Sequence, residues 1–322
     1  MLKDKIDAGL LERFEAGLDP LNPDLSKIPA KIIGYGEMST IFIINHPGQE
    51  KIAYKRMPIF QSQDEMETYE SLFAEYSTGL RNIGINIPES ALARVMPDKG
   101  NSVIYGAQER LPAASIGNAL IQRLDENSVR LLFLCVLREL KKVFTCNRER
   151  PSLTFGIDGQ ISNWAMKDYQ EGKPVTEKTE LFYIDTGTPL IHKDGIEQLN
   201  PELFLRSTPS FLVWLIRLFF LEEVMTRYYD FRKVTIDFIA NFYKEQRPEF
   251  IPMLIETANN FFAGESVQFS IAPLTEKEIV SYYKEDAMIW RLYLAFRKMD
   301  RFLHLKILGK PYVYILPGKI KR

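Results

Sequence analysis

Residues 31–55, which read KIIGYGEMSTIFIINHPGQEKIAYK, decide how the chain folds. Three short runs in this stretch, 31–33, 40–44 and 51–55, are rich in β-branched and aromatic residues, as is typical of strands. A glycine-containing turn separates the first two runs, and the turn NHPGQE separates the second from the third. The segment therefore predicts three consecutive antiparallel strands.

The segments that follow extend this sheet. After Pro58, apolar residues recur every three or four positions on a charged background as far as Gly79 and Gly84, which predicts an amphipathic helix. The runs 91–96 and 102–108 flank the turn PDKGN and predict a hairpin. Together these elements predict a five-stranded antiparallel sheet with one helix after the third strand.

Most of the remaining chain has a helical pattern. Apolar residues recur at helical spacing in five further stretches, which predict helices at residues 2–18, 129–143, 211–229, 234–243 and 251–262. Thr275 and Glu278 form a capping-box pattern that opens the last helix. Only residues 151–190 interrupt the pattern, with the short strand-like runs ISNWAM and LFYID around a polar loop.

These patterns predict an α+β fold in three parts. We expect an N-terminal helical extension at 1–30, a sheet-containing lobe at 31–110 and a helical lobe at 111–322. At 322 residues the chain has the length of about two domains of ordinary size. Its content of 46% hydrophobic and 26% charged residues is that of a folded globular protein.

Charge and composition exclude several classes of function. The 41 Lys and Arg residues against 42 Asp and Glu residues leave a net charge of −1, so no overall positive field attracts nucleic acid, and we expect no nucleic-acid partner. The most apolar run, residues 211–221, contains Arg217 and is shorter than the roughly 20 residues that cross a bilayer. We interpret that run as a buried helix and expect no membrane partner.

The compartment follows from the N-terminus and the cysteines. The charged N-terminus lacks the continuous apolar core of a signal peptide. The only cysteines, Cys135 and Cys146, are too few for a disulfide framework, which favours a reducing environment. We therefore expect a cytoplasmic protein.

Two polar features of the sheet could carry chemistry. In the turn GYGEMS, Gly34 and Gly36 let backbone N–H groups approach phosphate oxygens closely. Lys55, in the third strand, would lie under that turn and could neutralise phosphate charge. Glu70 on the following helix could orient Lys55 by ion pairing, and Glu67, one turn earlier, is the competing choice.

Two more polar features lie in the region that interrupts the helices. The loop GIDGQISNW carries Asp158, whose carboxylate could accept a hydroxyl proton, and Asn163, whose amide oxygen could bind a cation. Asp185 ends the run LFYID and would lie beside Asn163, which makes an oxygen-rich site suited to Mg²⁺. Each of these residues also has an ordinary interpretation, as part of a turn, a cap or a solvated helix face.

The serial order of these features resembles that of a known superfamily. A glycine-rich hairpin, a strand-three lysine, a helical glutamate, Asp-x-x-x-x-Asn and an apolar strand ending in Asp follow one another as in protein kinases. The chain resembles the protein-kinase-like superfamily, and most closely its aminoglycoside phosphotransferase and choline kinase branch, whose loops read like HGDxxxxN followed by IDW or IDF. The resemblance spans residues 31 to about 190. It implies a two-lobed α+β fold with a five-stranded antiparallel sheet, one helix and a large helical C-terminal lobe.

The resemblance also implies an activity and a role for each residue. The activity is an ATP- and Mg²⁺-dependent transfer of phosphate to the hydroxyl of a small molecule. Asp158 would orient or deprotonate the acceptor, and Asn163 and Asp185 would ligate Mg²⁺. The turn and Lys55, with Glu70 behind it, would hold the phosphates of the nucleotide, and backbone groups at the lobe junction would hold adenine. The residues implied are Gly34, Gly36, Ser39, Lys55 and Glu70 for the phosphates and Gln108, Glu109 and Leu111 for adenine.

The sequence departs from the family pattern at three points, one of which is Ser39 in place of the third loop glycine, a change that small-molecule kinases also tolerate. Gly156 stands where members of the family have a histidine, two residues before Asp158. Thr186 and Gly187 follow Asp185, where small-molecule kinases often have an aromatic residue. The loss of the histidine favours an alternative function, a catalytically silent nucleotide-binding protein with a regulatory or structural role.

Overall fold

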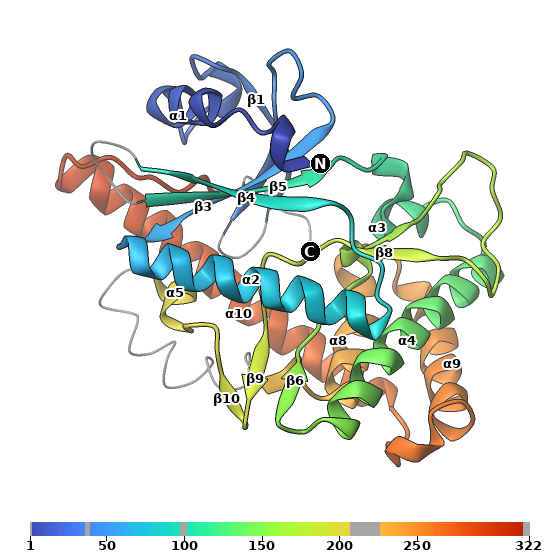
Figure 1. Ribbon diagram of the computed structural model, residues 1–322. Helices are drawn as coiled ribbons and strands as arrows, with labels where there is room; N and C mark the ends of the chain where they lie inside the picture. Colours follow the sequence, from blue (N-terminus) through green and yellow to red (C-terminus); the bar gives the residue numbers. More distant parts are fainter. Residues whose placement is uncertain (1, 36–38, 97–101, 207–225, 318–322) are drawn as a thin grey trace.

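The computed structural model describes residues 2–35, 39–96, 102–206 and 226–317 (Figure 1). The predicted five-stranded antiparallel sheet is confirmed, with the strand order β1-β2-β3-β5-β4. Its strands are β1 (Ala30–Tyr35), β2 (Thr40–Ile44), β3 (Ile52–Phe60), β4 (Ser90–Val95) and β5 (Ser102–Glu109). The predicted helix after the third strand is α2 (Gln63–Ile83), so the predicted α+β fold class is confirmed.

The sheet is covered by one helix on each face (Figure 1). Helix α1 (Ala8–Gly17) packs through Phe14 against Phe42 and Tyr54, whereas α2 packs through Tyr69 on the side of Met57. Because side chains alternate along a strand, Tyr54 faces α1, and Lys55 and Met57 face the opposite side. The alternation of β3 therefore directs Lys55 toward the helical part of the molecule.

The helical part is built around one long helix, as predicted. Helix α4 (Glu126–Glu149) buries residues along most of its length and contacts α8 and α9. The other described helices are α3 (Gly117–Leu120), α5 (Glu202–Leu205), α8 (Phe231–Lys244), α9 (Ile251–Ala263) and α10 (Glu276–Phe302). Helix α10 opens with the predicted capping box, in which Thr275 and Glu278 exchange side-chain and backbone hydrogen bonds.

Short strands interrupt this helical part. The strand-like runs ISNWAM and LFYID contain β7 (Trp164–Met166) and β8 (Leu181–Tyr183), which pair with each other. A second small sheet, which the sequence did not predict, consists of β6 (Leu153–Phe155), β9 (Ile191–Lys193) and β10 (Ile196–Glu197). Among the described residues, no helix is long and apolar enough to cross a membrane.

The two ends of the chain differ from the predictions. The opening helix is shorter than 2–18, because Asp7 caps α1 and a 3₁₀ turn, Leu2–Lys5, precedes it. Most of the predicted helix at 211–229 lies outside the described residues.

The final described residues return to the sheet. There the carbonyl oxygen of Val313 accepts a 2.8 Å hydrogen bond from Arg56, and Tyr312 and Tyr314 are buried. The segment has no helical or strand periodicity, and nothing in the sequence analysis predicted this contact.

Candidate functional site

Two of the predicted site residues, Lys55 and Asp185, meet between the sheet and the small β7–β8 pair. Lys55 Nζ, from β3, lies 2.8 Å from Oδ1 of Asp185, which is two residues past the end of β8. Both side chains are only partly buried, with exposed fractions of 20% and 27%. The ion pair joins the two parts of the chain across 130 residues and leaves both charges accessible from solvent.

The loop after Asp185 is fixed by helix α2. The buried Tyr69 hydroxyl donates a 2.8 Å hydrogen bond to the carbonyl oxygen of Gly187. A Cβ atom at position 187 would lie 2.6 Å from Lys55 Nζ, so glycine leaves room for the lysine ammonium at this point. Lys55 therefore lies directly against the backbone at Gly187.

The predicted ion pair between Lys55 and Glu70 is not formed, and neither is the alternative with Glu67. Glu70 accepts hydrogen bonds of 2.7 and 2.5 Å from the guanidinium of Arg94, on β4, and Glu67 accepts one of 3.1 Å. The reason is the rotation of α2, which turns Tyr69 toward Gly187 and the next residue toward β4. The planar guanidinium then binds the carboxylate of Glu70 with two parallel bonds.

Asp158 lies in a loop whose backbone is held from several sides. The hydroxyl of Tyr76 donates to the carbonyl oxygen of Gly156 at 2.8 Å, and the amide of Gly156 donates to Leu190. The amide of Asp158 itself donates to the hydroxyl of Tyr183 at 3.4 Å. A Cβ at position 156 would lie 2.9 Å from the Cβ of Leu190. Glycine is therefore required here by packing, and Tyr76 and Tyr183 hold the loop.

Asn163 and Asp185 lie at the same end of the β7–β8 pair. Trp164 is paired with Tyr183 in the register, and the amide of Ile184 donates to the carbonyl oxygen of Asn163 at 2.9 Å. The two predicted metal ligands are thus on adjoining strand ends. Within the described ranges, no group of three or more His, Cys, Asp or Glu side chains is placed to hold a metal ion.

The Asp158 carboxyl has a strongly perturbed pKa. Burial and, second, the negative charge of Asp237 raise the pKa of Asp158 to about 7. Asp237, on α8, is itself buried and accepts a 2.9 Å hydrogen bond from the hydroxyl of Tyr282. A negative charge close to Asp158 disfavours the ionisation of its carboxyl.

Asp237 also reaches the loop of Asp158 directly. The side-chain amide of Gln160 donates a hydrogen bond to Asp237 at 3.3 Å, and the backbone N–H of the same residue donates to Asp158 Oδ1 at 3.0 Å. Sequence reasoning missed this acid. A single charged residue inside the apolar run VTIDFIA of a predicted helix was the available signal, because such a position is buried on most helices.

Of the residues predicted to bind the nucleotide in the glycine-containing turn, the structure describes Ser39 and Gly34. The Ser39 hydroxyl is buried and has no hydrogen-bond partner in the described part of the chain. Gly34 is in β1 opposite Ile41, and Gly36 lies outside the described residues.

The predicted lobe-junction residues lie at the end of β5. Gln108 and Glu109 are its last residues, and the Glu109 amide donates to the carbonyl oxygen of Glu89 at 3.0 Å. Leu111 follows the strand, and its backbone N–H and C=O form no hydrogen bond with other described residues. Of the three, Leu111 has backbone groups free for a ligand.

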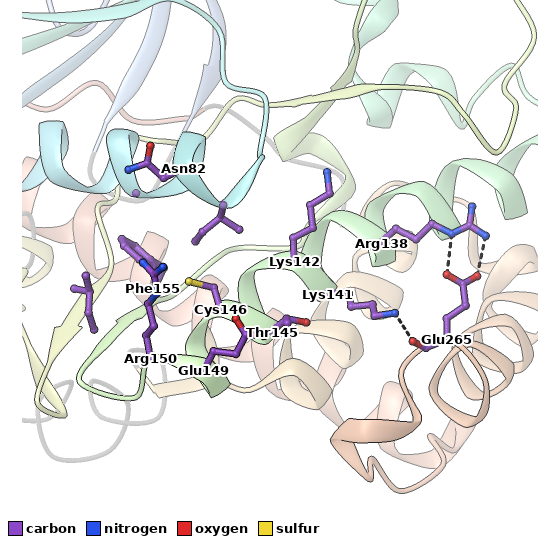
Figure 2. Close-up of a pocket in the computed structure, with 13 residues that line it drawn as sticks. Asn82, Arg138, Lys141, Lys142, Thr145, Cys146, Glu149, Arg150, Phe155 and Glu265 are labelled. Carbon is purple, nitrogen blue, oxygen red and sulfur yellow. Dashed lines mark hydrogen bonds and ion pairs between the residues drawn. The ribbon is translucent and has the colours of Figure 1, made fainter.

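A separate cavity of about 630 Å³ lies between α2 and α4 (Figure 2). None of the predicted site residues lines it. Its basic side chains are used within the protein: Arg138 pairs with Glu265 at 2.8 Å, and Lys142 donates to the carbonyl oxygen of Gly84, at the end of α2. Cations at the last turn of a helix satisfy free carbonyl groups there, as Lys142 does at the end of α2.

Comparison with solved structures found several similar chains. The structure titled WaaP in complex with acyl carrier protein is 14% identical, with a TM-score of 0.34, and the match covers 86% of this chain and 95% of that chain. The GDP and kanamycin complex of APH(2")-IIia is 11% identical, with a TM-score of 0.34 and coverage of 77% and 99%. The GDP complex of wild-type aminoglycoside 2'-phosphotransferase-IIIa is 13% identical, with a TM-score of 0.32 and coverage of 74% and 95%.

Comparison with curated proteins found no match. A family match, in contrast, covers most of the sequence, from residue 28 to residue 302. The chain belongs to the family described as a family of unknown function, DUF6206.

Proposed function

We propose that this protein is a phosphotransferase that moves the terminal phosphate of a nucleoside triphosphate, ATP in the first instance, to a hydroxyl of a small molecule. The observation that carries the proposal is the 2.8 Å pair between Lys55 and Asp185 on the side of the sheet that faces the Asp158 loop. A partly exposed cation and anion, held by two different parts of the chain, provide the charges that bind a phosphate and its metal ion.

The residues present fit a magnesium nucleotide. Mg²⁺ is usually held by one or two protein oxygen ligands together with phosphates and water, so Asp185 with Asn163 suffices without a larger cluster. The ion, when bound, would neutralise the charge that develops on the phosphates. Lys55 would contact the inner phosphates, and the buried, unpartnered hydroxyl of Ser39 would donate to a phosphate oxygen.

The adenine would bind at the junction of the lobes proposed at 31–110 and 111–322. The free backbone N–H and C=O of Leu111 could form the two hydrogen bonds that recognise a base edge. Glu70 would have no direct part in nucleotide binding, because Arg94 holds it against β4.

Asp158 would act on the acceptor hydroxyl. A general base is most effective when its pKa lies near the working pH, and the pKa of Asp158 is raised to about 7. The loop keeps its geometry through Tyr76 and Tyr183. Catalysis would consist mainly of positioning the two reactants and neutralising charge.

The second candidate is a catalytically silent nucleotide-binding protein, which Gly156 favours because the family's histidine is absent there. Both candidates share the nucleotide site and differ only in transfer. Transfer of labelled phosphate from ATP or GTP to a panel of small hydroxyl compounds would separate them, with Asp158→Asn as the control. Product formed by the wild type and lost in the variant supports the phosphotransferase. Nucleotide binding with equal background signals from both proteins supports the silent protein.

A further inference from the structure

The inference concerns the outer face of α10. The inner face of this helix packs against α8, and Ile279 and Ala287 are buried there. The opposite face of a surface helix is normally polar, because it contacts only water. In α10 it is not.

Four large apolar side chains on this outer face are exposed. Met288 is 52% exposed, Leu292 43%, Met299 38% and Phe302 58%, and Ala295 between them is also exposed. Their spacing of four, three, four and three residues places them on one line along the helix. We name these five residues the outer stripe. Leu305, Ile307 and Leu308 continue the exposed apolar surface past the end of α10.

Basic side chains flank the outer stripe on one side. Lys284, Arg291 and Lys298 are all exposed and recur every seven residues, which places them in a row beside the stripe. Glu285, which is also exposed, lies on the opposite flank of the stripe, and the other acids of this part of α10, Asp286 and Asp300, pair with Arg227 at 3.7 Å and with His304 at 3.3 Å. The surface is therefore locally basic on a chain whose net charge is −1.

We propose that α10 lies on an anionic membrane surface through the outer stripe. A helix with an apolar line and a row of Lys and Arg binds in the headgroup region parallel to the membrane, without crossing it. In Figure 1 the C-terminal end of α10 reaches the edge of the molecule, beyond the start of α2. The expectation of no membrane partner rested on export signals and spanning segments, and a surface-lying helix has neither.

A phospholipid surface fits better than a second copy of the chain. Two copies of α10 packed antiparallel through the stripe would bring the rows containing Arg291 together, and like charges facing each other oppose association. An anionic surface instead attracts every member of the row, by about fivefold in affinity for each basic residue.

The test is co-sedimentation of the full-length protein with vesicles. The first vesicles contain phosphatidylcholine alone, and the second contain phosphatidylcholine with phosphatidylglycerol in a 3:1 ratio. We expect binding to the anionic vesicles that is at least about tenfold tighter than to neutral ones and that weakens as salt rises. Replacing Lys284, Arg291 and Lys298 together by Gln should weaken it about a hundredfold, from three factors of about five.

A matched pair of variants tests the apolar part. Leu292→Glu with Phe302→Glu should abolish binding, whereas Leu25→Glu, at a residue that is 76% exposed and far away in sequence, should leave it unchanged. All three positions are exposed, so melting curves should match the wild type. The proposal is overturned if the wild type does not bind anionic vesicles, if neutral vesicles bind equally, or if the double variant binds normally. A wild-type dimer that the double variant loses would assign the stripe to self-association and would also overturn it.

Discussion

Two neighbouring residues of β3, Lys55 and Arg56, form ion pairs of opposite kinds on the two faces of the sheet. Arg56 binds Glu15 of α1 with two bonds, of 2.6 and 2.8 Å, and the exposed fractions of the two side chains are 4% and 10%. A third bond joins Arg56 to the carbonyl oxygen of Val313. Lys55 has a single bond to Asp185 at a partly exposed position.

The difference separates a structural contact from a site. On the outer face the donors of Arg56 have protein acceptors, and the same carboxylate of Glu15 also accepts from Tyr105. Burial alone would raise the pKa of Glu15, but the hydrogen bonds and charge of Arg56 lower it below its usual value. On the inner face the ammonium of Lys55 has one acceptor, Asp185, and its side chain is partly exposed. Bond number and burial, rather than the presence of an ion pair, therefore distinguish the two functions.

The largest expected effect is on the inner face. Lys55→Met should reduce phosphate transfer by about 100-fold or more, because one preorganised charge at the transferring phosphate is removed. The free energy of unfolding should change by less than about 1 kcal/mol, since the pair is partly exposed. Transfer assays and urea unfolding measure the two quantities. A variant that transfers phosphate at the wild-type rate would contradict the assignment of Lys55.

On the outer face, replacing the cation by methionine should strongly reduce stability and leave phosphate transfer unchanged. Arg56→Met leaves the buried Glu15 carboxylate without its partner, which should lower the free energy of unfolding by about 3–5 kcal/mol. Transfer activity per folded molecule should be retained. Adding Glu15→Leu should recover part of the stability, because the uncompensated charge is removed. If the single and double variants were equally unstable, charge burial would not be the cause.

The raised pKa of Asp158 gives a dependence on pH. The folded state holds the Asp158 proton up to about pH 7, whereas the unfolded state releases it near 3.8, the usual pKa. As the pH rises between these values, the wild type should therefore lose stability relative to Asp158→Asn. Denaturant unfolding of both proteins at several pH values from 4 to 8 measures this difference. A constant difference would show that the pKa is not raised.

The pH profile of activity should depend on Asp237. Because the charge of Asp237 raises the pKa of Asp158, Asp237→Asn should move the acidic limb of the transfer rate to lower pH. Tyr282→Phe keeps both acids and removes the hydrogen bond that Tyr282 donates to Asp237 together with the one that it accepts from Arg227, so it shows the effect of these bonds without loss of the Asp237 charge. An unchanged limb in Asp237→Asn would separate this residue from the site.

The smallest expected effect is at Glu70. Because Glu70 binds Arg94 and not Lys55, Glu70→Gln should change transfer by less than about threefold and stability by about 0.2–1 kcal/mol. Kinetics of the purified variant measure the first and urea unfolding the second. A loss as large as that of Lys55→Met would mean that Glu70 reaches Lys55 in the working enzyme.

Local sequence patterns were sufficient to predict the sheet and the polar residues of the Lys55–Asp185 region. The alternation of side chains between the two faces of β3 can be recognised in its sequence. The run LFYID predicted a strand that ends at Asp185, beside Asn163. The partner of Lys55 depends on the rotation of α2, which helical periodicity leaves open among adjacent residues. Tyr69 and Tyr76 were identified only as apolar positions, although their hydroxyls hold Gly187 and Gly156.

Other parts of the site depend on contacts between distant segments. Gly156 is explained by Leu190, and the environment of Asp158 by Asp237 on a later helix. The carbonyl of Val313 that completes the bonding of Arg56 is 257 residues away. No local signal specifies such contacts, because they are set by packing once the core has formed.

Titration calorimetry of Mg²⁺·ATP into the wild type and Lys55→Met tests the central claim most directly. We predict a Mg²⁺-dependent binding isotherm for the wild type and an affinity at least about tenfold lower for the variant, equivalent to 1.4 kcal/mol or more. The Arg56→Met variant, measured where it is folded, should bind like the wild type. Absence of binding to the wild type, or equal affinities for wild type and Lys55→Met, would contradict the account.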